Sequence, residues 1–212
     1  PAAIGLRGNV MGGLGNRLST AIHTGTFSVS IRNGTLMRQN VSASLALSSV
    51  LSFVLAIIAS VVASAFGIES NLNLSQLAMV SIVGGLSASI LVLIATVALT
   101  VVGVRRNWDL DNLVAPSVST LGDVITVPTL FLASLALGLP AGAITTVGWV
   151  LAAASVAWFV VALRSRLPVL SQVCKESAPI LVVAAALSTM AGVVVTKQLS
   201  AFALLPALFI LQ

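Results

Sequence analysis

Charged residues are scarce in this sequence. It has 10 Lys and Arg and 5 Asp and Glu among 212 residues, whereas 58% of its residues are hydrophobic and the mean hydropathy is +1.13. This composition excludes a soluble domain and indicates an integral, multi-pass membrane protein. The net charge of +5 comes from basic residues scattered at the edges of apolar runs, without a patch of interleaved aromatics. A nucleic-acid partner is therefore not expected.

Cysteine and histidine each occur once. Cys174 alone can form neither an intramolecular disulfide nor a multi-cysteine metal site, and we interpret it as a small residue near a helix end. His23 has no second histidine nearby, which favours a hydrogen-bonded helix residue over a metal ligand. We expect no cofactor.

The motifs of intramembrane enzymes are also missing. No GxSxG-like elbow surrounds a candidate serine, and an aspartyl protease would need paired aspartates on two spans. Asp123 is the one acidic residue that falls inside a long apolar run. An intramembrane, protease-like enzyme is therefore the weaker alternative. A non-transporting membrane scaffold is a third reading, but it leaves Asp123 unexplained.

Long apolar runs predict an all-α, polytopic transmembrane helix bundle. The glycine-rich segment 1–25 carries Arg7, Asn9 and Arg17 among apolar residues, which predicts a broken or cavity-lining helix. A final run, 202–212, stops in mid-span. Between them we expect clean spans at 42–66, 76–104, 114–138, 142–163 and 178–196.

The connections between these spans alternate in charge. The connection 67–75 has only Glu69 and 138–141 has no charge, whereas the other two, 105–113 and 164–177, are rich in Arg and Lys. By the positive-inside rule the two basic connections are cytoplasmic.

Three of the five acidic residues lie in one stretch, 109–126. Asp111 or Asn112 can cap a helix and Pro116 is tolerated in its first turn, so the apolar run that follows predicts a helix entering the membrane. Asp109 and Asp111 should then lie at the cytoplasmic mouth.

Polar residues recur along this helix. Pro116, Thr120 and Asp123 are spaced i, i+4, i+7, as are Ser119, Asp123 and Thr126, so all should share one face. Asp123 would lie roughly 10 Å beyond Pro116, inside a hydrocarbon core about 30 Å thick. An ionised aspartate facing lipid there costs ~3 kcal/mol, so we expect it to face a protein interior or a water-filled path.

The two ends of the chain are similar. Residues 1–7 align with 206–212 so that proline, alanine and leucine match. Counting the spans gives the segments that begin at Pro1 and Pro206 the same orientation, which is the pattern of a parallel repeat in a longer chain. We expect three parts: a transmembrane unit at 1–138 without its first helix, a linker helix and cytoplasmic loop at 139–177, and the start of a second, truncated unit at 178–212.

Two separated motifs carry a family resemblance. They are Pro1-x-x-x-Gly5-Leu6-x-Gly8-Asn9 followed by Arg17-Leu18-Ser19-Thr20-Ala21, and Asp109-x-Asp111-Asn112-x-x-x-Pro116 followed by Gly122-Asp123-x-Ile125-Thr126. With them the chain resembles the MgtE-like divalent-cation transporters, and more closely their tandem-repeat solute-carrier and archaeal relatives. Leu110 departs from the pattern, because relatives usually have proline there.

The resemblance implies a fold of MgtE-like repeat units that transports divalent cations, magnesium foremost. It implies that Asp123 lines the pore and holds the ion, and that Gly8 and Asn9 belong to the core around it. A structural alternative makes Asp123 the buried partner of Arg7 or Arg17.

Magnesium sheds water reluctantly, so a transport site needs few carboxylates together with hydroxyls and carbonyls. We expect metal contacts from Asp123, Asn9, Thr120, Ser119, Asp109, Asp111 and Asn112. Helix capping and a solvated loop explain Asp109 and Asp111 equally well. The partners we expect are divalent cations, the lipid membrane, and a second repeat unit or homodimer partner that shares the pore. Two transport mechanisms, a channel and a coupled exchanger, are both compatible with the sequence.

Overall fold

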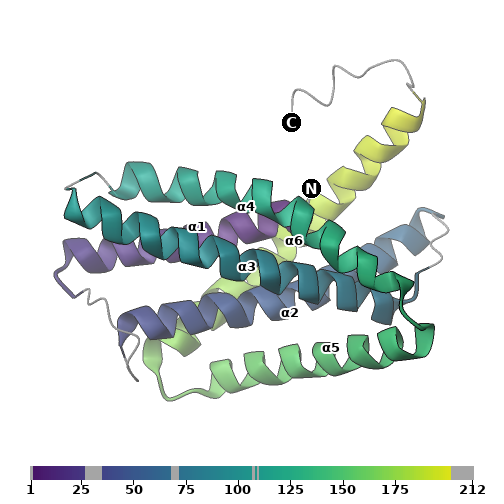
Figure 1. Ribbon diagram of the computed structural model, residues 1–212, viewed down its shortest axis with the longest axis horizontal. Coiled ribbons are helices and arrows are strands. Elements are labelled where there is room, and N and C mark those ends of the chain that lie inside the picture. The colour runs from purple at the N-terminus through teal and green to yellow at the C-terminus, as the bar shows by residue number, and fades with distance from the viewer. Residues whose placement is uncertain (1, 27–34, 68–71, 107, 109, 202–212) are drawn as a thin grey trace.

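The computed structural model describes residues 2–26, 35–67, 72–106, 108 and 110–201, and for 110–113, 115 and 196–201 it describes the backbone alone. Every regular element in these ranges is a helix, as predicted (Figure 1). In chain order they are α1 (Ala2–His23), α2 (Leu36–Ala65), α3 (Leu74–Arg105), α4 (Leu110–Leu135), the 3-10 turn η1 (Ala136–Gly138), α5 (Ala141–Arg164) and α6 (Pro168–Ala201).

Five helices are long and apolar enough to cross a membrane, which confirms the prediction of a multi-pass membrane protein. These spans are Leu36–Ala65, Leu74–Arg105, Pro116–Gly138, Ala141–Arg164 and Pro168–Val195.

The remaining helix, α1, is more polar. Of the two alternatives predicted for segment 1–25, the broken helix was wrong, whereas the cavity-lining helix agrees with the structure, because Asn9, Gly13 and Arg17 line a cavity. The helix runs without interruption from Ala2 to His23, because contacts with α2, α3, α4 and α6 hold its backbone in place. Two of its glycines, Gly8 and Gly15, lie against α4.

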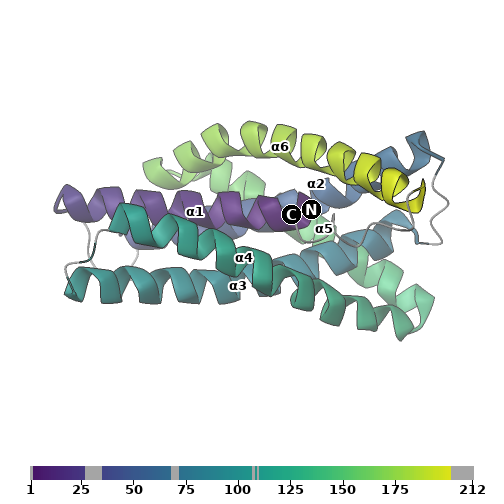
Figure 2. The same cartoon turned by 90° about the horizontal axis from the view of Figure 1, so that it is seen from above.

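α1 is packed on several sides, while part of its surface is exposed. It packs against α2, α3, α4 and α6, and Figure 2 shows it running between α6 on one side and α3 and α4 on the other. Its apolar side chains meet those of α2 in a core where each side chain is at most 1% exposed: Met11, Leu14, Leu18, Leu47 and Leu51. Because lipid is as apolar as this core, close packing rather than removal from water holds the helices together.

Small residues permit tight contacts between the helices. At the crossing of α3 and α4, a Cβ atom at Gly84 would lie 2.9 Å from Cα of Leu130, closer than real Cβ atoms approach a backbone. Glycine is therefore required at this crossing, which fixes α4 against α3.

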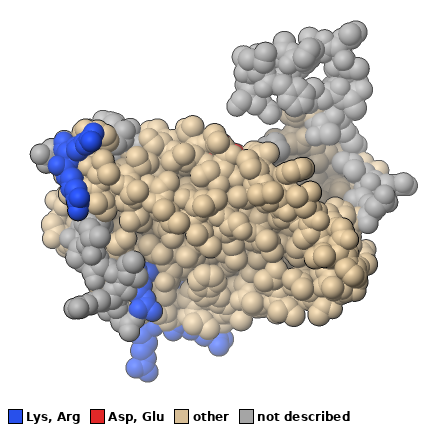
Figure 3. Space-filling view, viewed as in Figure 1, with Lys and Arg blue, Asp and Glu red and all other residues tan. Residues whose placement is uncertain are grey.

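The exposed basic side chains of the described residues gather at one end of the bundle (Figure 3). At this end α2 and α6 begin and α3 and α5 finish (Figure 1). The side chains are Arg38, Arg105, Arg106, Arg164, Arg166 and Lys175. The charge asymmetry of the connections is thus a property of the folded bundle, and by the positive-inside rule we predict that this end is cytoplasmic.

The segment 164–177 differs from its prediction as a loop. Only residues 165–167 connect α5 to α6, and α6 begins at Pro168. Proline suits the first turn of a helix, and Lys175, one of the basic residues that suggested a loop, lies on a helix longer than the hydrocarbon core. Arg164 ends α5, and Arg166 lies in the short connection. Pro1 and residues 202–212, on which the predicted repeat rests, lie outside the described residues.

Candidate metal site at the crossing of α1 and α4

The two motifs of the sequence meet where α1 crosses α4. A Cβ atom at Gly8 would lie 2.9 Å from Oγ of Ser119, and one at Gly122 would lie 3.5 Å from the backbone nitrogen of Gly8. Two turns further along α1, a Cβ atom at Gly15 would lie 2.8 Å from Cγ1 of Val114. Along these contacts the residue numbers rise on α1 and fall on α4, so the two helices are antiparallel. They are in close contact over several turns.

Three consecutive residues of α1 have three different surroundings. Arg7 is buried and points into the bundle, where Nε donates a hydrogen bond to the Gly85 carbonyl oxygen at 3.3 Å and Nη2 donates one to Ser52 Oγ at 3.4 Å. Gly8 faces α4. Asn9 is exposed. Successive helical residues are 100° apart, so anchoring Arg7 inward turns Asn9 outward.

Asp123 and Asn9 flank this crossing on the outside of the bundle. Asp123 follows Gly122 and lies thirteen residues from Leu110 and twelve from Leu135, midway along α4. Its side chain is exposed and makes no ion pair with a described residue. The described part of this chain does not cover Asp123, so the expectation that it faces a protein interior or a water-filled path stays a prediction. The carboxylate lies on the surface of the bundle.

The arginines that could have neutralised Asp123 are bound elsewhere. Arg7 contacts the Ala3 carbonyl oxygen as well as Gly85 and Ser52. The Nε of Arg17 donates to Asn40 Oδ1 at 2.8 Å and its Nη2 donates to Ser44 Oγ at 3.3 Å. All these acceptors are neutral. The alternative role of Asp123 as a buried salt-bridge partner thus finds no support.

The predicted polar stripe on α4 is divided between two environments. Thr120 is exposed, as is Asp123, and it donates a hydrogen bond to the Pro116 carbonyl oxygen at 3.0 Å. Ser119 is half-buried against Gly8, whereas Thr126 is buried and donates to the Gly122 carbonyl oxygen at 2.5 Å. The prediction of a single shared face is wrong for Thr126. Residues spaced i, i+4, i+7 spread around the helix axis, and this spread places Thr126 on the side that faces the bundle.

The start of α4 also differs from its prediction. The helix begins at Leu110, so Pro116 lies inside it rather than in its first turn. Asp111 and Asn112 lie in that first turn and cannot precede the helix as caps; their side chains are outside the described part. Asp109 is outside the described residues altogether.

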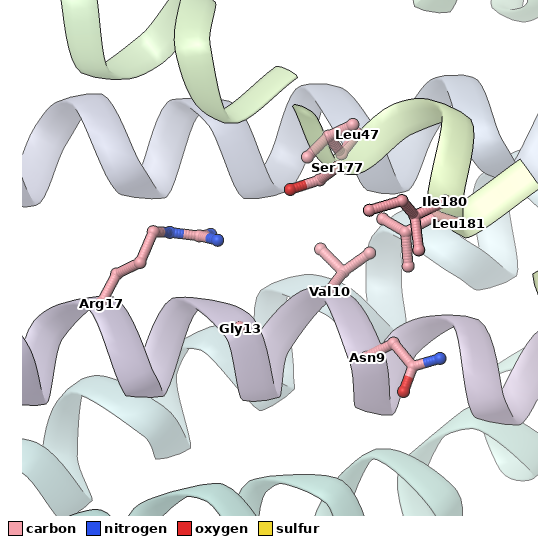
Figure 4. A pocket seen from close by; sticks show the side chains of 8 residues that line it. All are labelled: Asn9, Val10, Gly13, Arg17, Leu47, Ser177, Ile180 and Leu181. Carbon is pink, nitrogen blue, oxygen red and sulfur yellow. The ribbon is translucent and has the colours of Figure 1, made fainter. Parts of the chain in front are cut away.

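A small cavity adjoins the crossing on the side of α6. Its volume is about 140 Å³, and Asn9 and Val10 of α1 are among the residues that line it. In Figure 4 Val10 points toward Leu47 of α2 and Ser177 of α6, whereas Asn9 lies further from them. Asn9 thus borders both this cavity and the exposed surface that carries Asp123.

The described residues contain no group of three or more His, Cys, Asp and Glu side chains that could hold a metal ion. The polar groups at the crossing are the carboxylate of Asp123, the amide of Asn9 and two hydroxyls, those of Ser119 and Thr120. This donor set suits a hydrated hard cation, which is held partly through its water. It does not form a closed cage.

A comparison with protein families identifies the chain. The model of MgtE, divalent cation transporter, matches residues 1–133, which span α1 to α4 and include both sides of the crossing. The chain belongs to the MgtE family. This is a family of transporters rather than enzymes, and the MgtE chain described here is an integral, multi-pass membrane protein. No curated protein and no solved structure gives a significant match.

Sequence reasoning missed the contact between Arg7 and Gly85, which determines how α1 is rotated in this MgtE protein. Arg7 occupies a variable position of the first motif, and Gly85 lies in a run of small residues far from either motif. The available signal was a glycine pair, Gly84 and Gly85, in the middle of a span.

Proposed function

We propose that this MgtE protein transports magnesium along a pathway on the outer face of the α1–α4 crossing. In this proposal Asp123 supplies the charge, while Asn9, Thr120 and Ser119 contact the retained water of the ion. Magnesium keeps several water molecules and takes few protein carboxylates, so a site with one carboxylate in each unit fits its chemistry.

One observation carries the proposal: Asp123 is an exposed carboxylate midway along a membrane-spanning helix, without an ion-pair partner among the described residues. An ionised aspartate exposed to lipid at this depth would cost ~3 kcal/mol on insertion scales. A protein face or a water-filled path must therefore cover Asp123 in the membrane.

A second unit would supply that cover. It would be either a repeat unit of a longer chain or another copy of this one, joined face to face along α1 and α4. Two Asp123 carboxylates facing one pathway would balance the charge of a divalent cation, whereas one carboxylate leaves it half neutralised. Val124 and Val127 lie beside Asp123 on α4, and their side chains are 65% and 54% exposed. These apolar side chains would form a water-free contact between the two units around the pathway.

Asp109, Asp111 and Asn112 precede or begin α4 at the basic, cytoplasmic end. We propose that they attract cations to the mouth of the pathway, against the field of the surrounding arginines.

The test is magnesium flux into proteoliposomes that hold an internal magnesium-sensitive dye. Asp123→Asn keeps the size of the side chain and removes its charge, and we expect it to lower flux about tenfold or more, since one charge-assisted contact is lost. Glu176→Gln is the matched control, because Glu176 is exposed near the cytoplasmic end of α6 and far along the chain from the crossing. Parent-level flux in a folded Asp123→Asn protein would overturn the assignment.

A further inference from the structure

The second half of the first motif lies away from the α1–α4 crossing. Arg17, Thr20 and Ala21 instead line a cavity of about 350 Å³ at the basic end of the bundle, together with Asn16 of α1, Asn40 of α2 and Val169 of α6. This cavity opens toward the surface between the end of α1 and the beginnings of α2 and α6. The proposed magnesium pathway does not use it.

Arg17 is the charged group of this cavity. Its guanidinium extends from α1 toward α2 (Figure 4), where its two hydrogen bonds go to the neutral side chains of Asn40 and Ser44. A guanidinium has five N–H donors, and Arg17 makes no ion pair with a described residue. A half-buried cation without a carboxylate partner favours an anion in the space beside it.

The rest of the wall suits a group with phosphate oxygens on one side and carbon on the other. Asn16 and Asn40 offer amide N–H groups, although one N–H of Asn40 and the Thr20 hydroxyl already donate to backbone carbonyl oxygens. Ala21, Leu36 and Val169 are apolar. The carbonyls at the end of α1 are already satisfied, because the backbone nitrogens of Thr24 and Thr26 donate to Thr20 and Ala21. Their hydrogen-bonding capacity is thus used within this end of α1, and the charge of Arg17 opposes the partial negative charge of the helix terminus.

The surrounding charge has the same sign. Arg38, Arg166 and Lys175 are exposed at this end, and Glu176 is the one exposed carboxylate among the described residues of α6. Arg17 lies six residues, roughly 9 Å, inside the end of α1, a depth that long basic side chains bridge to lipid headgroups.

We propose that this cavity binds the phosphate of an anionic phospholipid from the cytoplasmic leaflet, with Arg17 as its main contact. The phosphate ester would accept hydrogen bonds from Arg17 and from the polar wall, and the glycerol end of the acyl chains would lie against the apolar wall. Anionic headgroups are attracted to such basic membrane edges. A soluble phosphate has the same charge but none of the apolar contact, so a lipid is the occupant we favour.

The experiment measures lipid retention by native mass spectrometry. Full-length protein, stripped of lipid in detergent, is titrated with phosphatidylglycerol or with phosphatidylcholine of the same acyl chains. We expect preferential retention of phosphatidylglycerol and a loss of about tenfold in Arg17→Gln, the effect of one charge-assisted contact. Arg38→Gln, which removes an exposed arginine at the same end outside the cavity wall, should retain the lipid as the parent does.

A second variant covers the case in which Arg17→Gln fails to fold. Thr20→Phe is at an exposed position, leaves the Arg17 hydrogen bonds intact and fills the cavity, so it should also lose phosphatidylglycerol. Inorganic phosphate at millimolar concentration should neither raise the melting temperature nor displace the lipid. Equal retention of both lipids, retention unchanged in folded variants, or binding of inorganic phosphate in place of the lipid would each overturn the proposal.

Discussion

Arg7 and Gly85 are in direct contact across the interface of α1 and α3. Nε of Arg7 donates to the carbonyl oxygen of Gly85 at 3.3 Å, and a Cβ atom at residue 85 would overlap the Arg7 guanidinium and the Ser52 hydroxyl. Glycine at position 85 thus makes room for a charged side chain that anchors α1 two residues before Asn9.

The first prediction concerns this contact. Gly85→Ala should force the Arg7 guanidinium out of its place and lower the free energy of unfolding by about 1–3 kcal/mol, as overpacking does. Thermal unfolding in detergent measures the effect. Gly142→Ala is the control, since nothing lies within 4 Å of a Cβ atom there. Equal melting temperatures for the two variants would contradict the role of Gly85.

The second prediction concerns the α1–α4 crossing. Gly8→Val should separate the helices, because even a Cβ atom at Gly8 lies 2.9 Å from Ser119 Oγ. Both the melting temperature and magnesium flux should fall. Gly12→Val, on the same helix with open space around its Cβ position, should leave the melting temperature near that of the parent. If Gly12→Val is the more damaging change, the crossing is not where the structure has it.

The third prediction concerns orientation. In a Cys174→Ser background, a cysteine at Arg106 should react with an impermeant thiol reagent only when the cytoplasmic side is open, and one at Leu72 should react from outside. Both positions are exposed, at opposite ends of α3. Labelling at 106 from outside intact cells would reverse the orientation and remove the cytoplasmic role of Asp109 and Asp111.

The fourth prediction concerns the shared pathway. Cysteines at Val124, next to Asp123, should be joined between two copies, or to the matching position of a second unit, by oxidation or a short bifunctional linker. Val161→Cys on α5 is equally exposed, 67% against 65%, and should not cross-link because it faces lipid. Cross-linking at Val161 alone would place the contact on the wrong side of the bundle.

Hydropathy alone predicted the membrane spans well, because such long apolar runs are rarely stable outside a bilayer. The start of α6 could not be predicted from the sequence. Basic residues such as Arg166 and Lys175 occur both in loops and on helices that continue past the hydrocarbon core. The unbroken α1 was missed for a related reason. Its glycines weaken an isolated helix, but contacts with four neighbouring helices, absent from any local pattern, maintain it.

The candidate site was predicted in part. The position of Asp123 inside a span follows from sequence, whereas its exposure depends on how α4 is rotated against α1 and α3. The contacts at Gly8 and Gly84 determine that rotation. Spacing alone therefore grouped Thr126 with Asp123, although the fold buries the first and exposes the second.

The gathering of basic side chains at one end has a consequence for assembly. Turning the bundle over in a bilayer would carry Arg38, Arg105, Arg106, Arg164, Arg166 and Lys175 through hydrocarbon together, at a cost of ~3 kcal/mol or more for each. Once inserted, every copy keeps the same orientation. Two copies that meet through one face must then be related by a twofold axis along the membrane normal, which places their Asp123 side chains at equal depth.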